Sequence, residues 1–244
     1  MNILFPIAGE GRRFQNQSNL PKPLIDINGK PMLWWAIKTL NMDGNYIFII
    51  LDYHDSALNE KMSSILNEIK NVKIIRVDKP TKGSAFTCLL AEEDINNDEP
   101  LLITNCDQYL NWDSKQFIEF VGQDPLDACV SIYDHGDIRV GEKSPYCFVD
   151  IDESGRITRF CEKFAISMHS MNGLHYWKQG KDFVSSCKKV IQDGITVNGE
   201  YYLSSSFNYL IEDKKVILPF FMEKHQYLSL GTPEDVQKNI QMIV

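Results

Sequence analysis

The sequence predicts an α/β fold of the Rossmann-like, doubly wound kind: a mostly parallel mixed sheet with a small second half that contains a β-hairpin. Apolar runs of strand length alternate with amphipathic stretches of helix length through the first 125 residues, and hairpin patterns replace this alternation beyond residue 140. An alternating β–α order favours a parallel sheet with helices on both faces. With 244 residues, 43% of them hydrophobic, the chain can bury one large core.

The first half supplies the parallel strands and the helices that cover them. Pro31 suits the first turn of a helix, and Asp113 resembles an N-cap with Gln116 three residues on. The expected strands are 2–7, 45–51, 72–77, 100–104 and 127–133, and the expected helices are 31–42, 55–70, 83–95 and 113–122. Ligands of such sheets lie over the carboxyl ends of the strands, which places residues 9–11 and Asp107 at one edge.

The second half is expected to begin with a hairpin. Strands 146–150 and 157–162 flank Asp152-Glu153-Ser154-Gly155, whose residue types favour a tight turn. The elements expected after it are strand 170–177, helix 179–193, helix 200–211, strands 215–221 and 225–229, and a last helix from Pro233. No linker or repeat divides the chain, so we expect one domain, 1–244, with halves 1–125 and 126–244.

Composition argues against several classes of partner. The net charge is −8 and the pI about 5.2, which disfavours nucleic acid and anionic membranes as partners. No apolar run reaches the length of a membrane span and the N-terminus lacks a signal-peptide pattern, so we expect a cytoplasmic protein. The six cysteines show no paired spacing, which favours buried thiols over a zinc site. The oligomeric state stays open, a homo-oligomer included.

The most informative stretch follows the first strand. Gly9 and Gly11 can adopt conformations closed to other residues, and they leave main-chain N–H groups free to face a phosphate. Arg13 adds positive charge beside them, and Lys22 stands between two prolines that hold it on a stiff, extended segment. The stretch therefore predicts a polyphosphate site.

This loop differs from the two common phosphate loops. A Walker loop would continue with Gly-Lys-Ser/Thr, whereas Gly11 is followed by two arginines. A dinucleotide loop would run from G-x-G-x-x-G straight into a helix, whereas position 14 is Phe and residues 15–20 look like a loop. A lone G-x-G also fits a plain tight turn, but Arg13 and the constrained Lys22 favour the phosphate site.

A series of short motifs follows along the chain. They are Ala8-Gly9-x-Gly11-x-Arg13-Phe14, Pro21-Lys22-Pro23-Leu24, Asn28-Gly29-Lys30-Pro31-Met32, Lys82-Gly83-Ser84-Ala85, Thr104-Asn105-Cys106-Asp107-Gln108, Phe160-x-Glu162-Lys163, Asn172-Gly173-Leu174-His175-Tyr176, Asn198-Gly199-Glu200-Tyr201-Tyr202 and Leu230-Gly231-Thr232-Pro233-Glu234-Asp235. Together they resemble the sugar-phosphate nucleotidylyltransferases, the NTP-transferases that include glucose-1-phosphate thymidylyl-, uridylyl- and cytidylyltransferases. Several motifs in the family's order are far more specific than any one of them.

The resemblance implies a reaction in which a phosphate monoester attacks the α-phosphorus of an NTP and releases pyrophosphate. It implies that Asp107 binds Mg²⁺ and that Arg13, Lys22 and Asp107 have catalytic roles. The implied nucleotide-binding residues are Ala8, Gly9, Gly11, Arg13, Lys22, Gly83, Ser84 and Asp107, and the implied acceptor-binding residues are Glu162, Lys163, Gly173 and Glu200. The product would be an NDP-linked sugar or small polar alcohol for a surface glycan, with a pyrimidine base favoured by resemblance.

Elementary chemistry agrees with this reaction. A phosphate monoester has its second pKa near about 6, so its dianion is nucleophilic at neutral pH without a general base. The enzyme has to neutralise and align two charged reactants, which cations and Mg²⁺ can do. Asp107 follows an apolar strand, and Mg²⁺ prefers one or two carboxylates with phosphate oxygens and water. A turn-capping role is the plainer alternative for Asp107.

Three motifs have alternative interpretations. Asp150-x-Asp152 matches the metal motif of many glycosyltransferases that use NDP-sugars, so a GT-A type glycosyltransferase is an alternative, although the adjoining turn residues favour a hairpin. Glu162 and Lys163 could form a surface ion pair worth little to stability. Glu200 is expected to open a helix, where a carboxylate is favourable with the helix dipole alone.

Ser229 departs from the family's pattern. The family commonly has an Asp two residues before the closing Gly-Thr, as a second metal ligand, and Ser229 stands at that place. Either Asp107, phosphates and water hold the metal, or another carboxylate substitutes. The departure also keeps open a catalytically silent, nucleotide-binding regulator.

Overall fold

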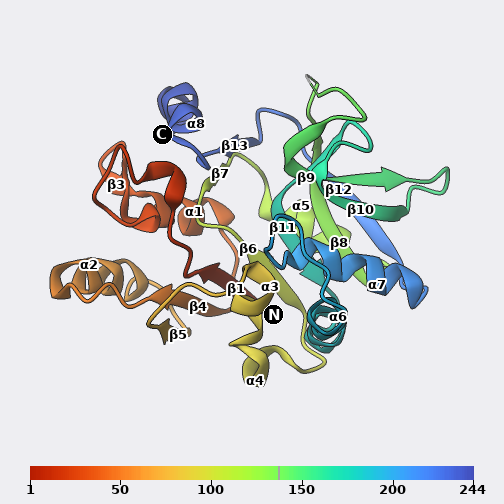
Figure 1. Ribbon diagram of the computed structural model, residues 1–244, viewed down its shortest axis with the longest axis horizontal. Helices are drawn as coiled ribbons and strands as arrows, with labels where there is room; N and C mark the ends of the chain where they lie inside the picture. Colours follow the sequence, from red (N-terminus) through yellow and green to blue (C-terminus); the bar gives the residue numbers. More distant parts are fainter. Residues whose placement is uncertain (137) are drawn as a thin grey trace.

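The computed structural model describes residues 1–136 and 138–244 (Figure 1). Within them the centre is a nine-stranded mixed sheet. Its strands are β1 (Asn2–Ile7), β4 (Asn45–Leu51), β5 (Val72–Val77), β6 (Leu101–Thr104), β8 (Ala128–Asp134), β9 (Lys143–Ile151), β10 (Ile157–Phe164), β11 (His169–Trp177) and β12 (Ile217–Phe221). Its path is β10-β9-β11-β6-β1-β4-β5, with β8 joined to β11 and β12 to β8. The predicted α/β fold is confirmed.

The first half forms the parallel part of the sheet. β1 lies between β4 and β6, so that Leu4 is level with Ile47 on one side and Ile103 on the other. β5 adds to the outer edge of β4, again in parallel. Strands covered on both faces are apolar throughout, which explains why these runs show no polar alternation. The predicted first-half strands match within one residue at each end.

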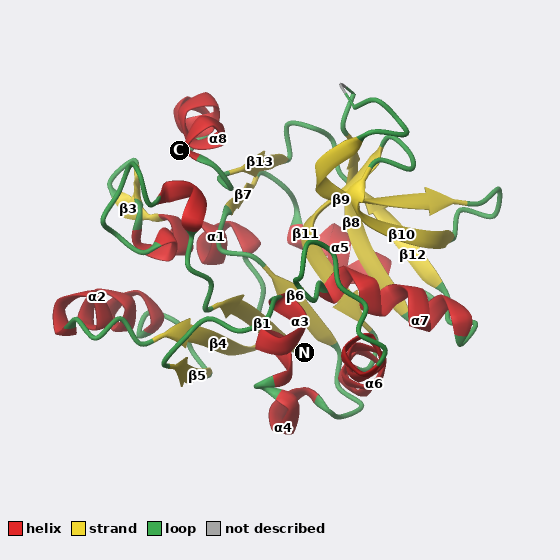
Figure 2. Ribbon diagram, viewed as in Figure 1, coloured by secondary structure: helices red, strands yellow, loops and turns green. Residues whose placement is uncertain are grey.

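Helices cover both faces of the sheet (Figure 2). One face carries α1 (Met32–Leu40), α2 (Ser56–Leu66) and α5 (Ser114–Val121), and the other carries α3 (Ser84–Leu89), α4 (Glu92–Ile95), α6 (Gly180–Gln192) and α7 (Ser206–Glu212). Neighbouring strand residues point to opposite faces. Leu4 therefore belongs to the core beneath α3 and α6, whereas Phe5 belongs to the core beneath α1 and α5.

The second half adds antiparallel strands at the β6 edge. β11 pairs with β6 and with β8, and β12 then runs parallel to β8. β9 and β10 form the predicted hairpin. Its turn is closed by Asp152, whose carboxylate accepts hydrogen bonds from the N–H groups of Ser154 and Arg156 at 2.9 and 3.0 Å. The turn interpretation of Asp152 is thus confirmed.

Small elements that the sequence did not reveal shape the loops at the carboxyl ends of the strands. Two are single-turn helices, η1 (Arg12–Phe14) and η2 (Lys22–Leu24), with η3 (Leu203–Ser205) and η4 (Ile240–Met242) later. β2 (Asp26–Ile27) pairs with β3 (Lys30–Pro31), and β7 (Gln108–Leu110) pairs with β13 (Tyr227–Ser229). The last helix, α8 (Pro233–Asn239), returns to the first half, where Leu230 and Ile243 pack with Phe14.

Three predicted helices are wrong in extent. The predicted helix 55–70 ends at Leu66. The predicted helix 83–95 is broken at Leu90 and Ala91 into α3 and α4. The predicted helix 200–211 begins only at Ser206, because the main chain of Tyr201 is used elsewhere: its N–H donates to Lys82 O and its C=O accepts from Ala85 N, both at 3.0 Å. This tertiary contact overrides the local helix signal.

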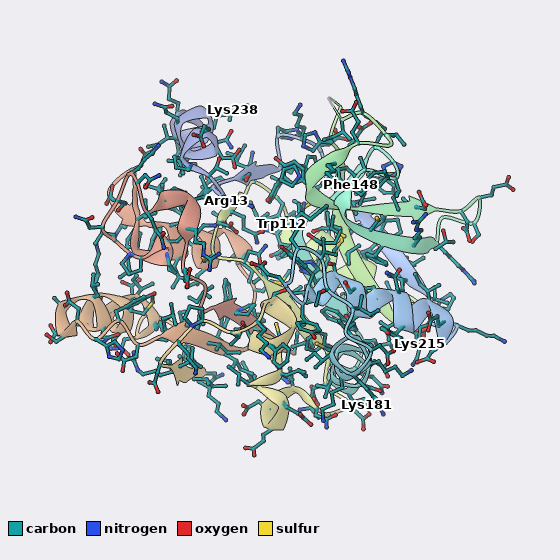
Figure 3. All side chains as sticks on the ribbon, viewed as in Figure 1. Arg13, Trp112, Phe148, Lys181, Lys215 and Lys238 are labelled. Atoms are coloured by element: carbon teal, nitrogen blue, oxygen red, sulfur yellow. The ribbon has the colours of Figure 1, made fainter. Side chains whose placement is uncertain are left out.

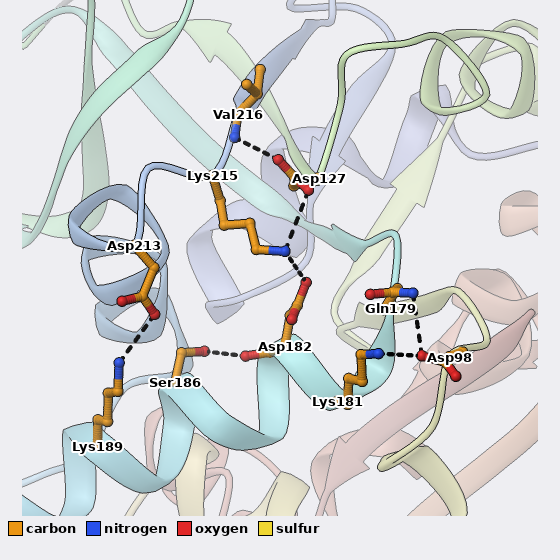
Figure 4. Close-up of polar contacts among 10 residues, drawn as sticks. All are labelled: Asp98, Asp127, Gln179, Lys181, Asp182, Ser186, Lys189, Asp213, Lys215 and Val216. Atoms are coloured by element: carbon orange, nitrogen blue, oxygen red, sulfur yellow. Dashed lines mark hydrogen bonds and ion pairs between the residues drawn. The ribbon is translucent and has the colours of Figure 1, made fainter.

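Charged side chains tie α6 to the rest of the second half (Figure 4). Lys215 Nζ lies 3.0 Å from Asp182 Oδ2 and 3.5 Å from Asp127 Oδ1. Near the other end of the helix, Lys189 Nζ lies 3.0 Å from Asp213 Oδ2. Apart from Asp182, which is 18% exposed, the side chains are about a third to a half exposed, so each pair contributes little by itself. They align the helix and stand away from the cavities described below.

Two expectations from composition can be compared with the structure. In the parts of the chain that it describes, no helix has the length and apolar character needed to cross a membrane. The six cysteines are free, and all are buried except the half-buried Cys161. Burial raises the pKa of the Cys129 thiol well above its usual range and that of Cys187 to about 12, so these thiols are protonated and unreactive.

Candidate active site

The glycine loop starts where β1 ends and is closed by close backbone contact. Gly11 has φ +62°, in the left-handed region, and a Cβ on it would come 2.8 Å from the Cβ of Lys22. Only glycine fits without displacing the lysine. Phe14 is buried at the end of η1 and anchors the loop on the core, while Arg13 stays exposed beside it. The loop is thus fixed at both ends.

Lys22 lies beside the metal-ligand candidate. Its Nζ is 2.5 Å from Asp107 Oδ2, and the two side chains are only 18% and 23% exposed. Burial acts to lower the pKa of Lys22, but the charge of Asp107, the neighbouring Cys106 and the hydrogen bond to Asp107 together outweigh burial, and the pKa is raised. Burial likewise acts to raise the pKa of Asp107, and Lys22 outweighs it, so this pKa is lowered. Both groups are therefore charged at neutral pH.

Asp107 is positioned by the small β7–β13 sheet. It follows β6, and its C=O accepts a hydrogen bond from Leu230 N at 2.8 Å. Gln108 is the register partner of Ser229 across the two strands. The closing motif, more than 120 residues further along the chain, is thereby held against the end of β6.

A first cavity of about 450 Å³ opens over the glycine loop. Its other wall begins at Gly83, whose φ is +129° and where a Cβ would come 2.4 Å from Tyr201 O. Ser84 Oγ accepts a hydrogen bond from Leu203 N at 3.1 Å, which fixes this wall to η3. The predicted nucleotide residues on its lining are Ala8, Gly9, Gly11, Arg13, Lys22, Gly83 and Ser84. Asp107 lines the neighbouring cavities instead.

A second cavity, of about 470 Å³, lies on the side of the second half. Of the predicted residues, Arg13, Ser84, Asp107, Glu162 and Gly173 line it. Arg13 lines both cavities, as do Ser84 and Tyr202, and Figure 3 labels Arg13 in the N-terminal half, to the left of Phe148 in the other half. The two cavities therefore meet at Arg13.

Lys163 and Glu162 divide between the first and second cavities, although both also line a further cavity of about 480 Å³ beside Arg13. Lys163 sits in a β-bulge with φ +62°, and it lines the first cavity, not the second. Its Nζ donates to Pro145 O at 2.5 Å and lies 3.5 Å from Glu162 Oε1. Glu162 is only 9% exposed and accepts a hydrogen bond from Ser204 Oγ at 2.7 Å. The pair is thus a buried part of the site and not a surface ion pair.

Glu200 does not open a helix, contrary to the sequence prediction. It lies in a tight turn, where its N–H donates to Val197 O at 3.1 Å. Its carboxylate accepts a hydrogen bond from the Tyr202 hydroxyl at 2.9 Å and lines the first cavity. Burial and this carboxylate together raise the pKa of Tyr202. No helix forms at Glu200 because the main chain of the next residue, Tyr201, is hydrogen-bonded to Lys82 and Ala85.

Gly173 brings the second cavity's floor close to β6. Its φ is +108°, and a Cβ would come 2.6 Å from Asn105 Nδ2 and 3.0 Å from Gln108 Oε1. His175, two residues on, lines the same cavity and is 7% exposed. Burial lowers the pKa of His175 to about 4, so the imidazole is neutral at physiological pH.

Sequence reasoning gave no role to several residues of the second cavity. They include Asn105, Tyr146, Asn172, Ser204, Tyr227 and Asp235. Asp235 is the clearest case, since it is the third residue after Thr232 and forms a capping box with it. Its Oδ2 also accepts a hydrogen bond from the Ser229 hydroxyl at 3.0 Å. The capping pattern predicts the helix start, but only the tertiary structure shows the carboxylate facing a cavity.

Comparison with known proteins gives consistent results. The profile of the nucleotidyl transferase family matches residues 7–241. The catalytic subunit beta of mannose-1-phosphate guanylyltransferase from Xenopus tropicalis is 26% identical over 167 residues, covering 67% of this chain and 45% of that protein. The bifunctional protein GlmU of Sulfurovum sp. (strain NBC37-1) is 21% identical over 249 residues, covering 98% of this chain and 53% of that protein. The chain spans about half the length of these relatives.

Solved structures share the fold over nearly the whole chain. The nucleoside-diphosphate-sugar pyrophosphorylase from Vibrio cholerae RC9 superposes with a TM-score of 0.79 at 18% identity, covering 98% of this chain and 99% of that one. The inositol-1-phosphate CTP transferase from T. maritima gives a TM-score of 0.75 at 14% identity, covering 99% and 94%. A UDP-glucose pyrophosphorylase complexed with UDP-glucose gives 0.76 at 19%, covering 99% and 97%.

Proposed function

The chain belongs to the nucleotidyl transferase family, and we propose that it joins an NTP to a sugar phosphate or another small phosphorylated polar acceptor, releasing pyrophosphate. The observation that carries the proposal is the meeting of the two cavities at Arg13, with the Lys22–Asp107 pair beside the junction. The first cavity would take the NTP and the second the acceptor. Both are of the size that small-molecule sites have.

The proposed chemistry needs positioning more than it needs a base. An oxygen of the acceptor's phosphate forms a bond to the α-phosphorus, and the bond from that phosphorus to the bridging oxygen of the pyrophosphate breaks. The phosphate dianion is nucleophilic at neutral pH, so no proton has to be removed. Arg13 would neutralise charge where the two phosphates meet, and Lys22 would hold the NTP's phosphates. Lys163 lines the first cavity beside Arg13 and would act at the same junction.

Asp107 would hold the Mg²⁺ ion. The site fits because its donor is a carboxylate that reaches both the second cavity and a smaller one, of about 250 Å³, lined also by Gly9, Lys22 and Asn105. Across residues 1–136 and 138–244, no three His, Cys, Asp or Glu side chains gather into a protein-only metal cage. Phosphate oxygens and water would complete the coordination, as Mg²⁺ prefers. Bound there, the ion supplies positive charge to the phosphates.

A pyrimidine NTP remains our proposal for the donor. Its support is that solved structures with this fold include proteins described as a CTP transferase, a UDP-glucose pyrophosphorylase and a glucose-1-phosphate thymidylyltransferase. The curated relatives named above include guanylyltransferases, so GTP belongs in any test. A role in surface glycan synthesis and a place in the cytoplasm belong to the same proposal.

The test is pyrophosphate release, measured with CTP, UTP, dTTP, GTP and ATP, each crossed with a panel of sugar and polyol phosphates. We expect one NTP and one class of acceptor to give release that depends on both substrates. A glycosyltransferase would instead consume an NDP-sugar and release no pyrophosphate. A silent regulator would bind a nucleotide, detected by calorimetry, without turnover for any pair. Either result would contradict the proposal.

A further inference from the structure

Asp235 is a carboxylate of the second cavity to which the described part of the chain gives no cationic partner. It lies in the first turn of α8, where its Oδ2 accepts hydrogen bonds from Ser229 Oγ at 3.0 Å and Thr232 N at 3.1 Å. The other two carboxylates of this cavity do have a lysine: Asp107 lies 2.5 Å from Lys22, and Glu162 lies 3.5 Å from its sequence neighbour. Within the described residues, no Lys, Arg or His lies within ion-pair distance of Asp235.

The whole cavity is short of positive charge. Arg13 is the one Lys or Arg among the described residues that line it, against three carboxylates. Arg13 lies at the junction with the first cavity, where, under the proposed function, it would serve the reacting phosphates. The part of the cavity around Asp235 therefore keeps a negative charge that no Lys or Arg of the described lining compensates, apart from Arg13 at the junction.

Aromatic side chains surround this carboxylate. Tyr227 and Tyr146 line the cavity with it. The ring centroid of Tyr227 lies 5.5 Å from that of Tyr133, and His135 lies 5.6 Å from Tyr133 and 4.8 Å from Tyr146, so the rings form one continuous wall. Burial and the nearby charge of Asp235 both raise the pKa of Tyr146. A wall of low polarity strengthens the field of a charge beside it.

Asp235 is also close to the centre of the proposed reaction. A Cβ on Gly231 would lie 3.4 Å from Asp107 Oδ2 and 3.6 Å from Asp235 Oδ2, so both carboxylates flank one residue. An acceptor whose phosphate lies near Asp107 and Arg13 brings the rest of its structure into the cavity that Asp235 lines.

We propose that Asp235 determines acceptor specificity: it rejects acceptors whose sugar or polyol part carries a negative charge, and it admits neutral or positively charged ones. The inference rests on the proposed function. Repulsion between two negative charges a few ångströms apart is large where solvent is limited, whereas a hydroxyl or ammonium group can donate to the carboxylate. Asp235 would thus exclude one class of substrate, the uronic acid phosphates.

The test compares hexose 1-phosphates with the matching hexuronic acid 1-phosphates, in the glucose, galactose and mannose series. Each pair differs only in a CH₂OH replaced by a carboxylate. With the best NTP, we expect the wild type to favour the neutral member by at least about tenfold in kcat/KM, and Asp235→Gln to narrow the ratio by roughly tenfold. Gln, like Glu, can replace Asp in the capping box, so Asp235→Glu should keep both the fold and the discrimination.

Glu234→Gln is the matched control. Glu234 is exposed, occupies the same helical turn and lines a different cavity, so removing its charge should leave the ratio unchanged. Equal use of hexose and hexuronic acid phosphates, or a ratio unchanged in a folded Asp235→Gln protein, would overturn the inference and leave the proposed function standing. No pyrophosphate with any pair would overturn both. Thermal unfolding of each variant establishes that it is folded.

Discussion

Lys22 Nζ lies 2.5 Å from Asp107 Oδ2, so the proposed phosphate-binding cation occupies an oxygen of the proposed metal ligand. The two side chains come from distant parts of the sequence and are both mostly buried. The backbone of Lys22 is held in place, because Gly11 packs against the Lys22 Cβ. The ammonium group of Lys22 therefore occupies the position beside Asp107 where the charge of a bound metal ion would act.

Replacing Lys22 with Met should lower turnover and raise the affinity for a divalent metal ion. Turnover should fall at least tenfold, since a lost charge-assisted phosphate contact is worth about 1.5–3 kcal/mol. The affinity of the nucleotide-free protein for Mn²⁺, as a paramagnetic probe for Mg²⁺, should rise, because Asp107 is released and a competing charge is removed. Mn²⁺ titration followed by EPR measures this. Weaker or unchanged Mn²⁺ binding in the folded variant would contradict the competition between Lys22 and the metal.

Asp107→Asn should abolish metal-dependent turnover and reduce stability. Asn keeps the shape but loses the charge that holds a hard cation. It also leaves Lys22 buried without its counter-charge, which costs about 3–5 kcal/mol for a fully buried pair. Since the side chains are 18% and 23% exposed, we expect about 2 kcal/mol.

Urea unfolding gives the stability change of Asp107→Asn, and the double variant with Lys22→Met is its control. Removing both charges should cost less than the sum of the two single changes, because no unpaired charge remains. Additive effects, or a Mg²⁺ dependence that overlays the wild type, would show that the contact has no such role.

Gly173→Ala should disturb the proposed acceptor site and leave the NTP site intact. The φ of +108° is unfavourable for alanine, and its methyl group would lie 2.6 Å from Asn105 Nδ2. We expect a loss of stability of about 1–3 kcal/mol and a higher KM for the acceptor. Steady-state kinetics with each substrate varied in turn would test it. An increase confined to the KM for the NTP would show that assigning Gly173 to the acceptor site is wrong.

His175 should make the protein sensitive to mild acid. Burial lowers its pKa to about 4, from an unfolded value of about 6.5, so the unfolded chain binds this proton first. The neutral histidine's contribution is complete above pH 6.5 and is lost as pH falls toward 4, by about 3 kcal/mol. Urea unfolding from pH 7 to 4 should show a smaller decline in His175→Gln. An equal decline in both proteins would exclude His175 as the cause.

The sequence alone determined the architecture of the sheet and the loop after β1. Uninterrupted apolar runs such as 2–7 and 45–51 predict strands covered on both faces, since only buried parallel strands tolerate such composition. Gly11 and the prolines around Lys22 are local signals, whose effect on the backbone does not depend on the rest of the chain. These features could be predicted because short-range sterics decide them.

The tertiary structure alone decided which charges face one another. The sequence placed Lys163 and Glu200 with the acceptor, but a bulge turns Lys163 toward the first cavity, and the contact of Tyr201 with residues 82–85 removes the helix expected at Glu200. From the sequence, Asp235 had no role beyond its place in the closing motif, and the pairing of β7 with β13 brings it beside Asp107. Such contacts join residues a hundred positions apart, and packing, not local preference, sets their energy.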